Sequence, residues 1–175
     1  MRLKAEIMDD AAVRRAVKRI AHEILERNGG CKNICFAGIK NGGIPLAKML
    51  ADNIYEIEGE HIPVGIIDIT HHRDDRSLMH STGNSVSDIP FDVSGKKVIM
   101  VDDVLCTGRT ARAAMEAIIS FGRPESIQYA VLIDRGHREL PVRGDYVGKN
   151  IPTSKSETIV VNVTPESELS VKLYE

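Results

Sequence analysis

The chain has 175 residues, of which 42% are apolar and 27% are charged, and its formal net charge at pH 7 is −2. This mixture is typical of a globular domain that buries a core without disulfides or a structural metal. The longest apolar run, residues 129–133, is far shorter than the roughly 18 residues of a membrane-spanning helix, so we expect no membrane partner. Tryptophan is absent and aromatic residues make up only 4%, which argues against nucleic-acid binding by stacking of bases on aromatic side chains.

Hydrophobic periodicity predicts helices and strands in alternation. In chain order we expect a helix over 9–27, a strand over 34–39, a helix over 45–55, a strand over 64–69, a polar lid loop over 70–90, a strand over 98–101, a helix over 108–121, a strand over 127–133, a basic loop with an edge strand near 146–149, and a last strand over 158–163. This order predicts an α/β fold with a central, mostly parallel sheet flanked by helices, in a single domain over residues 1–175.

The number of cysteines and the distribution of charges indicate the cellular compartment and the kind of binding partner. The N-terminal residues include acidic side chains and no long apolar stretch, so we expect no signal peptide. Three cysteines without a Cys-x-x-Cys pair favour a reducing, cytoplasmic location. Residues 14–19 carry four positive charges and no negative one, and residues 135–155 carry a net charge of +3. A basic patch on an otherwise acidic body is suited to receive a polyanion.

The clearest chemistry lies in residues 98–110. A buried strand leads into two adjacent carboxylates, Asp102 and Asp103, and then into Thr-Gly-Arg-Thr at the start of a helix. A helix N-terminus offers free amide N–H groups to a phosphate, and Gly108 lets the backbone approach it closely. The carboxylates suit the two hydroxyls of a ribose, or Mg²⁺. The segment therefore predicts a cradle for a ribose 5-phosphate.

A second loop, residues 38–43, follows the expected strand over 34–39. Its glycine spacing resembles that of a P-loop, but Ile44 and Pro45 stand where Lys and Ser/Thr are required. No dinucleotide-binding motif is present either. Backbone amides and Lys40 can hold a second anion such as pyrophosphate. A plain strand-to-helix turn is the alternative.

Residues 98–110 closely resemble the phosphoribosyl pyrophosphate (PRPP) signature of type I phosphoribosyltransferases. Nearly the whole chain further resembles the PyrR family of bacterial pyrimidine operon attenuators, which are also uracil phosphoribosyltransferases. The resemblance implies the type I phosphoribosyltransferase fold, with a flexible hood over residues 70–90. It is carried by residues 19–23, 68–70, 73–75, 122–124, the string Asp-Arg-Gly-His-Arg-Glu-Leu-Pro at 134–141, and residues 145–157.

The resemblance also implies roles for individual residues. Asp102 and Asp103 are expected to bind the ribose hydroxyls and, indirectly, the Mg²⁺ that accompanies PRPP. The catalytic set is completed by Lys40 and by Arg73 of the hood. The other expected contacts are Thr107, Gly108, Arg109 and Thr110 for the 5-phosphate, Lys40, Asn41, Gly42 and Gly43 for pyrophosphate, and Asp134, Arg135, Gly136, His137 and Arg138 for the uracil pocket.

The implied reaction joins PRPP and uracil to give UMP and pyrophosphate. Negative charge grows on pyrophosphate as the bond to the sugar breaks, and Mg²⁺, Lys40, Arg73 and backbone amides can stabilise it. A closed hood would exclude water. One departure matters, because relatives usually carry Thr-Arg-Gly after the lysine and this chain has Asn41-Gly42-Gly43. An RNA-binding regulator with weak or no transferase activity therefore remains an alternative.

A basic stripe lies on the first expected helix, where Arg15, Lys18, Arg19 and His22 recur at helical spacing. A solvated face is the ordinary interpretation, and His22 alone could equally be a packed core histidine. The resemblance instead implies that RNA meets a basic face of a homodimer or larger homo-oligomer. The expected RNA contacts are Arg15, Lys18, Arg19, His22, Arg138, Arg143 and Lys155.

The expected RNA target is a hairpin loop in the leader mRNA of a pyrimidine operon. UMP or UTP would tune the affinity for this RNA through the nucleotide site. Two other functions stay open at this point: a plain phosphoribosyltransferase without RNA regulation, and a transferase for another base, because the PRPP signature does not specify uracil.

Overall fold

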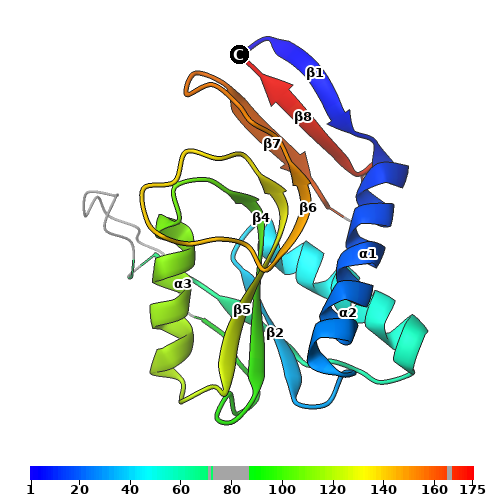
Figure 1. The fold of residues 1–175 in the computed structure, drawn as a ribbon, viewed down its shortest axis with the longest axis vertical. Helices are drawn as coiled ribbons and strands as arrows, with labels where there is room; N and C mark the ends of the chain where they lie inside the picture. The colour runs from blue at the N-terminus through cyan, green and yellow to red at the C-terminus, as the bar shows by residue number, and fades with distance from the viewer. Residues whose placement is uncertain (71, 73–86, 165–166) are drawn as a thin grey trace.

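The computed structural model of the chain describes residues 1–70, 72, 87–164 and 167–175. Its elements form two sheets and three helices within this part of the chain (Figure 1). In chain order they are β1 (Leu3–Met8), α1 (Asp10–Asn28), β2 (Ile34–Ile39), α2 (Gly43–Glu58), β3 (Val64–Ile67), β4 (Lys97–Leu105), α3 (Arg109–Ser120), β5 (Ser126–Asp134), β6 (Tyr146–Asn150), β7 (Thr158–Asn162) and β8 (Ser170–Tyr174).

The larger sheet has five strands in the order β3-β2-β4-β5-β6, and all neighbours are parallel. The predicted parallel sheet is therefore confirmed. Helices α1 and α2 cover one face and α3 covers the other (Figure 1). Successive side chains of β4 alternate between the two cores: Ile99 and Val101 pack on the side of α1 and α2, and Val98 and Met100 on the side of α3.

Helix α1 shows why local sequence suffices for some elements. Asp9 caps its N-terminus by accepting a hydrogen bond from the Ala12 amide at 2.7 Å. Val13, Val17 and Ile20 form the buried stripe that the spacing predicts. Gly29, with φ of 68°, ends the helix in the left-handed region. The polar face of α1 is thereby fixed toward solvent.

The smaller sheet was not predicted. It has the order β1-β8-β7, is antiparallel, and joins the two ends of the chain, with Leu3 opposite Tyr174 (Figure 1). A second difference concerns β4, which extends to Leu105, whereas the sequence predicted a loop from residue 102. Its pairing with β5 continues to Asp134, so Asp102 and Asp103 lie within the strand and not in a loop after it.

Candidate functional site

The predicted 5-phosphate loop lies at the carboxyl edge of the parallel sheet, between β4 and α3. Helix α3 begins at Arg109, and no side chain caps its N-terminus within the described residues. Gly108 has φ of 91° and is packed against Leu140 and Val142, so this position combines a left-handed backbone with a close neighbour. The Arg109 amide donates to the Thr107 hydroxyl oxygen at 3.3 Å, and the first-turn amides that follow it are available to an anion.

The two carboxylates stand beside this loop but in different environments. Asp102 is buried: its Oδ1 accepts the Asp103 amide at 2.9 Å, and its Oδ2 accepts the Tyr129 hydroxyl at 3.3 Å. Burial, followed by repulsion from Asp103, raises the pKa of Asp102 well above its usual range. Asp103 is half-buried, and its Oδ1 accepts the Val104 amide at 2.8 Å. A sugar hydroxyl or a cation arriving here would relieve the cost of the buried charge.

The pyrophosphate loop packs directly against β4. Loop residues 40–43 connect β2 to α2, and a Cβ at Gly43 would lie 2.1 Å from the Val101 carbonyl oxygen. Only glycine allows this approach. Asn41 has φ of 82°, a left-handed conformation that asparagine tolerates better than most residues. The structure thus brings together two segments that the sequence indicated separately, 40–43 and 102–110.

Lys40 is oriented by a residue that the sequence analysis had not placed in the site. Its Nζ lies 2.7 Å from Oδ2 of Asp68, whose side chain is only 3% exposed. The other oxygen of Asp68 accepts the Thr70 amide at 3.0 Å and the Thr70 hydroxyl at 2.5 Å. The Ser87 hydroxyl oxygen accepts the Asp68 amide at 2.9 Å and its O–H donates to the Asp68 carbonyl oxygen at 3.4 Å. The sequence position of Asp68, directly after β3 at the carboxyl edge of the sheet, was the signal that could have identified it as a site residue.

Gly42 needs a separate explanation because the family resemblance predicts an arginine at this position. Its φ of −66° and ψ of −29° are open to any residue. A Cβ at this position, however, would lie 2.2 Å from Oδ2 of Asp103 and 2.7 Å from its Cβ. The side chain of Asp103 therefore occupies the space, and an arginine cannot be restored unless Asp103 moves.

The predicted uracil-pocket segment, residues 134–138, borders the phosphate loop. The Arg135 amide donates to the Leu105 carbonyl oxygen at 3.0 Å. Arg138 pairs with Asp134 and donates to the carbonyl oxygens of Cys106 and Val142, each at 2.7 Å. Gly136 donates its amide to Asp134 at 3.0 Å. The segment is thus bound tightly to the loop that would hold the 5-phosphate.

The residues expected to contact RNA fall into two groups. Arg138 and Arg19 are engaged internally: Arg19 pairs with Glu23 and donates to the carbonyl oxygens of Val147 and Gly148, which ties α1 to β6. The others are exposed and make no hydrogen bond or ion pair with any described residue: Arg15, Lys18, His22, Arg143 and Lys155.

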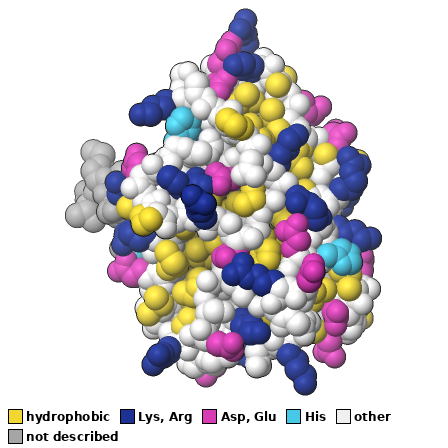
Figure 2. Space-filling model, viewed as in Figure 1, with side chains coloured by type: hydrophobic (Ala, Val, Ile, Leu, Met, Phe, Trp, Pro, Cys, Tyr) yellow, Lys and Arg dark blue, Asp and Glu magenta, His cyan; other side chains and the backbone are white. Residues whose placement is uncertain are grey.

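His22 is therefore not a packed core histidine, which settles that alternative. Lys and Arg side chains are scattered over the face shown in Figure 2, with acidic side chains between them. His137, expected in the uracil pocket, has φ of 62°, and its Nε2 donates to the Thr153 carbonyl oxygen at 2.7 Å. Arg73 and nearly all of the expected hood lie outside the described residues.

Comparison with known proteins decides the family. The phosphoribosyl transferase domain family matches residues 4–168. The Bifunctional protein PyrR of Bacillus pumilus is 56% identical over an alignment that covers 100% of this chain and 99% of that protein. The Bifunctional protein PyrR of Bacillus subtilis is 57% identical and covers 93% of this chain and 92% of its own length.

The chain belongs to the PyrR family. Solved structures agree at the level of the fold. The hypoxanthine phosphoribosyltransferase of Trypanosoma cruzi superposes with a TM-score of 0.72 at 17% identity, covering 97% of this chain and 96% of that one. A hypoxanthine phosphoribosyltransferase of Staphylococcus aureus gives a TM-score of 0.67 at 22% identity, covering 87% and 80%. The expected type I phosphoribosyltransferase fold is confirmed.

The carboxylates of Asp102 and Asp103 suit the Mg²⁺ that phosphoribosyltransferases use with PRPP. The described residues hold no group of three or more His, Cys, Asp or Glu side chains that could bind a metal alone. They do hold the adjacent pair Asp102 and Asp103. Mg²⁺ is commonly bound by one or two carboxylates together with substrate phosphates and water. This PyrR-family site thus suits a cation that arrives with its substrate.

No helix in the described part of the chain is long and apolar enough to cross a membrane.

Proposed function

We propose that this chain is an RNA-binding regulator of pyrimidine biosynthesis genes that responds to pyrimidine nucleotides and also transfers phosphoribosyl from PRPP to uracil. The observation that carries the proposal is the meeting of loops 40–43 and 102–110 at one sheet edge, in a chain over 50% identical to PyrR proteins along its length. Transcription attenuation through a leader hairpin is the mode of regulation that we propose, in the cytoplasm and as a homodimer or larger homo-oligomer.

In the transfer reaction, the bond between C1 of the ribose and pyrophosphate breaks, and uracil N1 forms the new bond to C1. The electron pair of the broken bond leaves with pyrophosphate, and N1 loses its proton. Asp102 and Asp103 hold the ribose hydroxyls, and the amides and hydroxyls of residues 107–110 hold the 5-phosphate. Asp102 and Asp103 would help to hold Mg²⁺ that arrives with PRPP, and the cation would supply positive charge to stabilise the departing pyrophosphate.

Lys40 contributes to the same charge stabilisation. Its ammonium group is already oriented by Asp68, so little rearrangement is required when pyrophosphate develops charge. The segment 134–138 is hydrogen-bonded to the end of β4, next to the phosphate loop, and is proposed to border the uracil. Arg73, which lies outside the described residues, is proposed to reach pyrophosphate.

The test is UMP formation by the purified protein from PRPP, Mg²⁺ and a panel of bases. Turnover with uracil alone supports the proposal and shows that the arginine absent at Gly42 is dispensable. Turnover with a purine instead would contradict it. A second candidate, a regulator that uses the site only as a sensor, is favoured by the contact of Gly42 with Asp103. It predicts UMP binding without turnover of any base.

A further inference from the structure

The segment 153–157 connects β6 to β7 and carries one of the exposed cations, Lys155. We call it the clamp loop. It contains no helix or strand, yet several side chains from other elements hold it. Lys155 makes no hydrogen bond or ion pair within the described residues, and its neighbours Ser154 and Ser156 are also exposed, with their hydroxyl oxygens 2.9 Å apart. A cation flanked by two hydroxyls suits a phosphate group.

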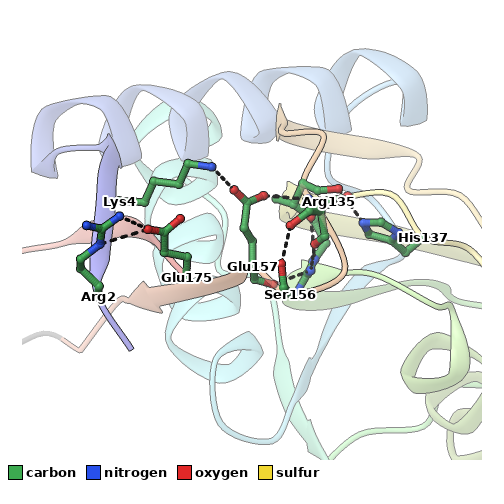
Figure 3. Close-up of polar contacts among 9 residues, drawn as sticks. Arg2, Lys4, Arg135, His137, Ser156, Glu157 and Glu175 are labelled. Atoms are coloured by element: carbon green, nitrogen blue, oxygen red, sulfur yellow. Dashed lines mark hydrogen bonds and ion pairs between the residues drawn. The ribbon is translucent and has the colours of Figure 1, made fainter.

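Glu157 holds the loop from one end. Its side chain is only 10% exposed, and its Oε2 accepts the Ser154 amide at 2.7 Å. Its other oxygen pairs with Lys4 of β1, so the clamp loop is tied to the smaller sheet (Figure 3). A buried carboxylate requires such partners. The proposed transfer reaction gives this one no role.

Arg135 holds the loop from the other side (Figure 3). Its Nε donates to the Thr153 hydroxyl at 3.1 Å, and its Nη2 donates to the carbonyl oxygens of Ser154 and Glu157 at 3.1 and 2.7 Å. His137 adds its bond to the Thr153 carbonyl oxygen. A guanidinium provides several donors in a rigid plane, which an ammonium group cannot reproduce.

Arg135 also reaches the nucleotide site through its backbone. Its amide donates to Leu105 at the end of β4, and the amides of Glu139 and Leu140 donate to the Thr107 carbonyl oxygen at 2.9 and 3.0 Å. The segment that fixes the clamp loop is therefore hydrogen-bonded to the loop expected to hold the 5-phosphate.

We propose that Arg135 and Glu157 are positioning residues of the RNA interface, which hold the clamp loop so that Lys155 meets an RNA phosphate. This inference rests on the proposed function. It also links bound UMP to the RNA surface, because the loop expected to hold the 5-phosphate and the clamp loop are hydrogen-bonded to the same short segment.

The experiment is a double-mutant cycle on affinity for a hairpin RNA transcribed from the leader of the chain's own pyrimidine operon. Arg135→Lys keeps the positive charge and removes the planar set of donors, and Lys155→Ala removes the proposed contact. Each single variant is expected to weaken binding about tenfold. The double variant is expected to bind about as weakly as Lys155→Ala alone, because Arg135 acts through Lys155.

Lys18→Ala is the matched control, since Lys18 is an exposed cation on α1 that shares no contact with Arg135 within the described residues. Its effect should multiply with that of Arg135→Lys, giving about a hundredfold loss. Salt dependence adds a second readout. Lys155→Ala should reduce the slope of log affinity against log salt by about one. Arg135→Lys keeps its own charge but should also reduce the slope, because it disturbs the same phosphate contact of Lys155.

Glu157→Gln supplies an independent variant on the same loop, and it should show the same non-additivity with Lys155→Ala. Effects that multiply between Lys155→Ala and both Arg135→Lys and Glu157→Gln would overturn the inference, as would an unchanged affinity in both positioning variants. Failure of the unsubstituted protein to bind the hairpin would instead overturn the proposed function itself.

Discussion

The loops at the carboxyl edge of the parallel sheet are fixed by backbone contacts, whereas most of the cations expected to meet RNA are exposed, on α1 and on two loops, and have no partner within the described residues. At the nucleotide site, Gly43 lies against the backbone of β4 and Asp102 is buried with a tyrosine partner. On the basic surface, Lys18 and Lys155 have no partner within the described residues. Chemistry on a sugar needs groups held in advance, while phosphate attraction tolerates flexible cations. The two regions should therefore respond differently to substitution.

The largest effect is expected at Asp102. Asp102→Asn removes a carboxylate proposed to bind the ribose and should lower kcat/KM for PRPP by about a hundredfold or more. The same change should stabilise the free protein at neutral pH. An acid whose pKa is raised by burial costs stability once the pH exceeds its unfolded pKa, and asparagine removes that cost.

Steady-state kinetics and thermal melting on one preparation check both halves of this prediction. A variant with lower activity and a lower melting temperature would show that Asp102 supports the fold and would contradict the assigned role.

The next largest effect concerns Gly42. Gly42→Arg restores the residue that relatives carry, but its Cβ would lie 2.2 Å from Oδ2 of Asp103. We expect transferase activity to fall about tenfold, since Asp103 must leave its position. Gly42→Ala is the control and should cause a similar loss, because the collision begins at Cβ. Kinetics of UMP formation decide the matter, and an increase in kcat for the arginine variant would refute this explanation.

A moderate effect is expected on the basic surface. Lys18→Ala should weaken hairpin binding about tenfold at physiological salt, and it should reduce the salt slope by about one. Transferase activity should not change, because Lys18 lies on the outer face of α1. Fluorescence anisotropy over a series of salt concentrations measures both quantities. A weaker affinity with an unchanged slope would show that Lys18 does not contact phosphate.

The smallest effect is a pH dependence at Glu157. The hydrogen bond from Lys4, followed by that from the Ser154 amide, lowers the pKa of Glu157 below its usual 4.5. Its contribution to stability is therefore present above pH 4.5 and is lost as the pH falls through the lowered pKa. The melting temperatures of the unsubstituted protein and of Glu157→Gln should differ at pH 7 and converge on acidification. A constant difference from pH 7 to pH 3 would contradict this.

Local sequence predicted the parallel sheet and its helices well, because their signals are local. The cap at Asp9 and the buried stripe of α1 are examples. The smaller sheet escaped prediction, since β1 and β8 are short and stabilise each other across almost the whole chain. Nothing within either strand identifies its partner. The end of β4 was placed too early because acidic residues inside a strand resemble the start of a loop.

The same holds for the candidate site: signals that are contiguous in the sequence could be predicted, and contacts between distant segments could not. The chemistry of segment 102–110 could be predicted because a strand, an acidic pair and a helix start are contiguous. The contact of Gly42 with Asp103 and the pairing of Lys40 with Asp68 could not, since each joins segments that only the folded sheet brings together. Arg138 was predicted as an RNA contact from the family resemblance, and the structure shows its guanidinium bonded to Asp134, Cys106 and Val142.

The most direct test of the account is the affinity of the protein for its own leader hairpin, measured with and without saturating UMP. A nucleotide site and an RNA surface that belong to one regulator predict tighter binding with UMP, by roughly tenfold, in the range usual for coupled sites. The same affinity with and without UMP would contradict the account, because the two regions would then act independently.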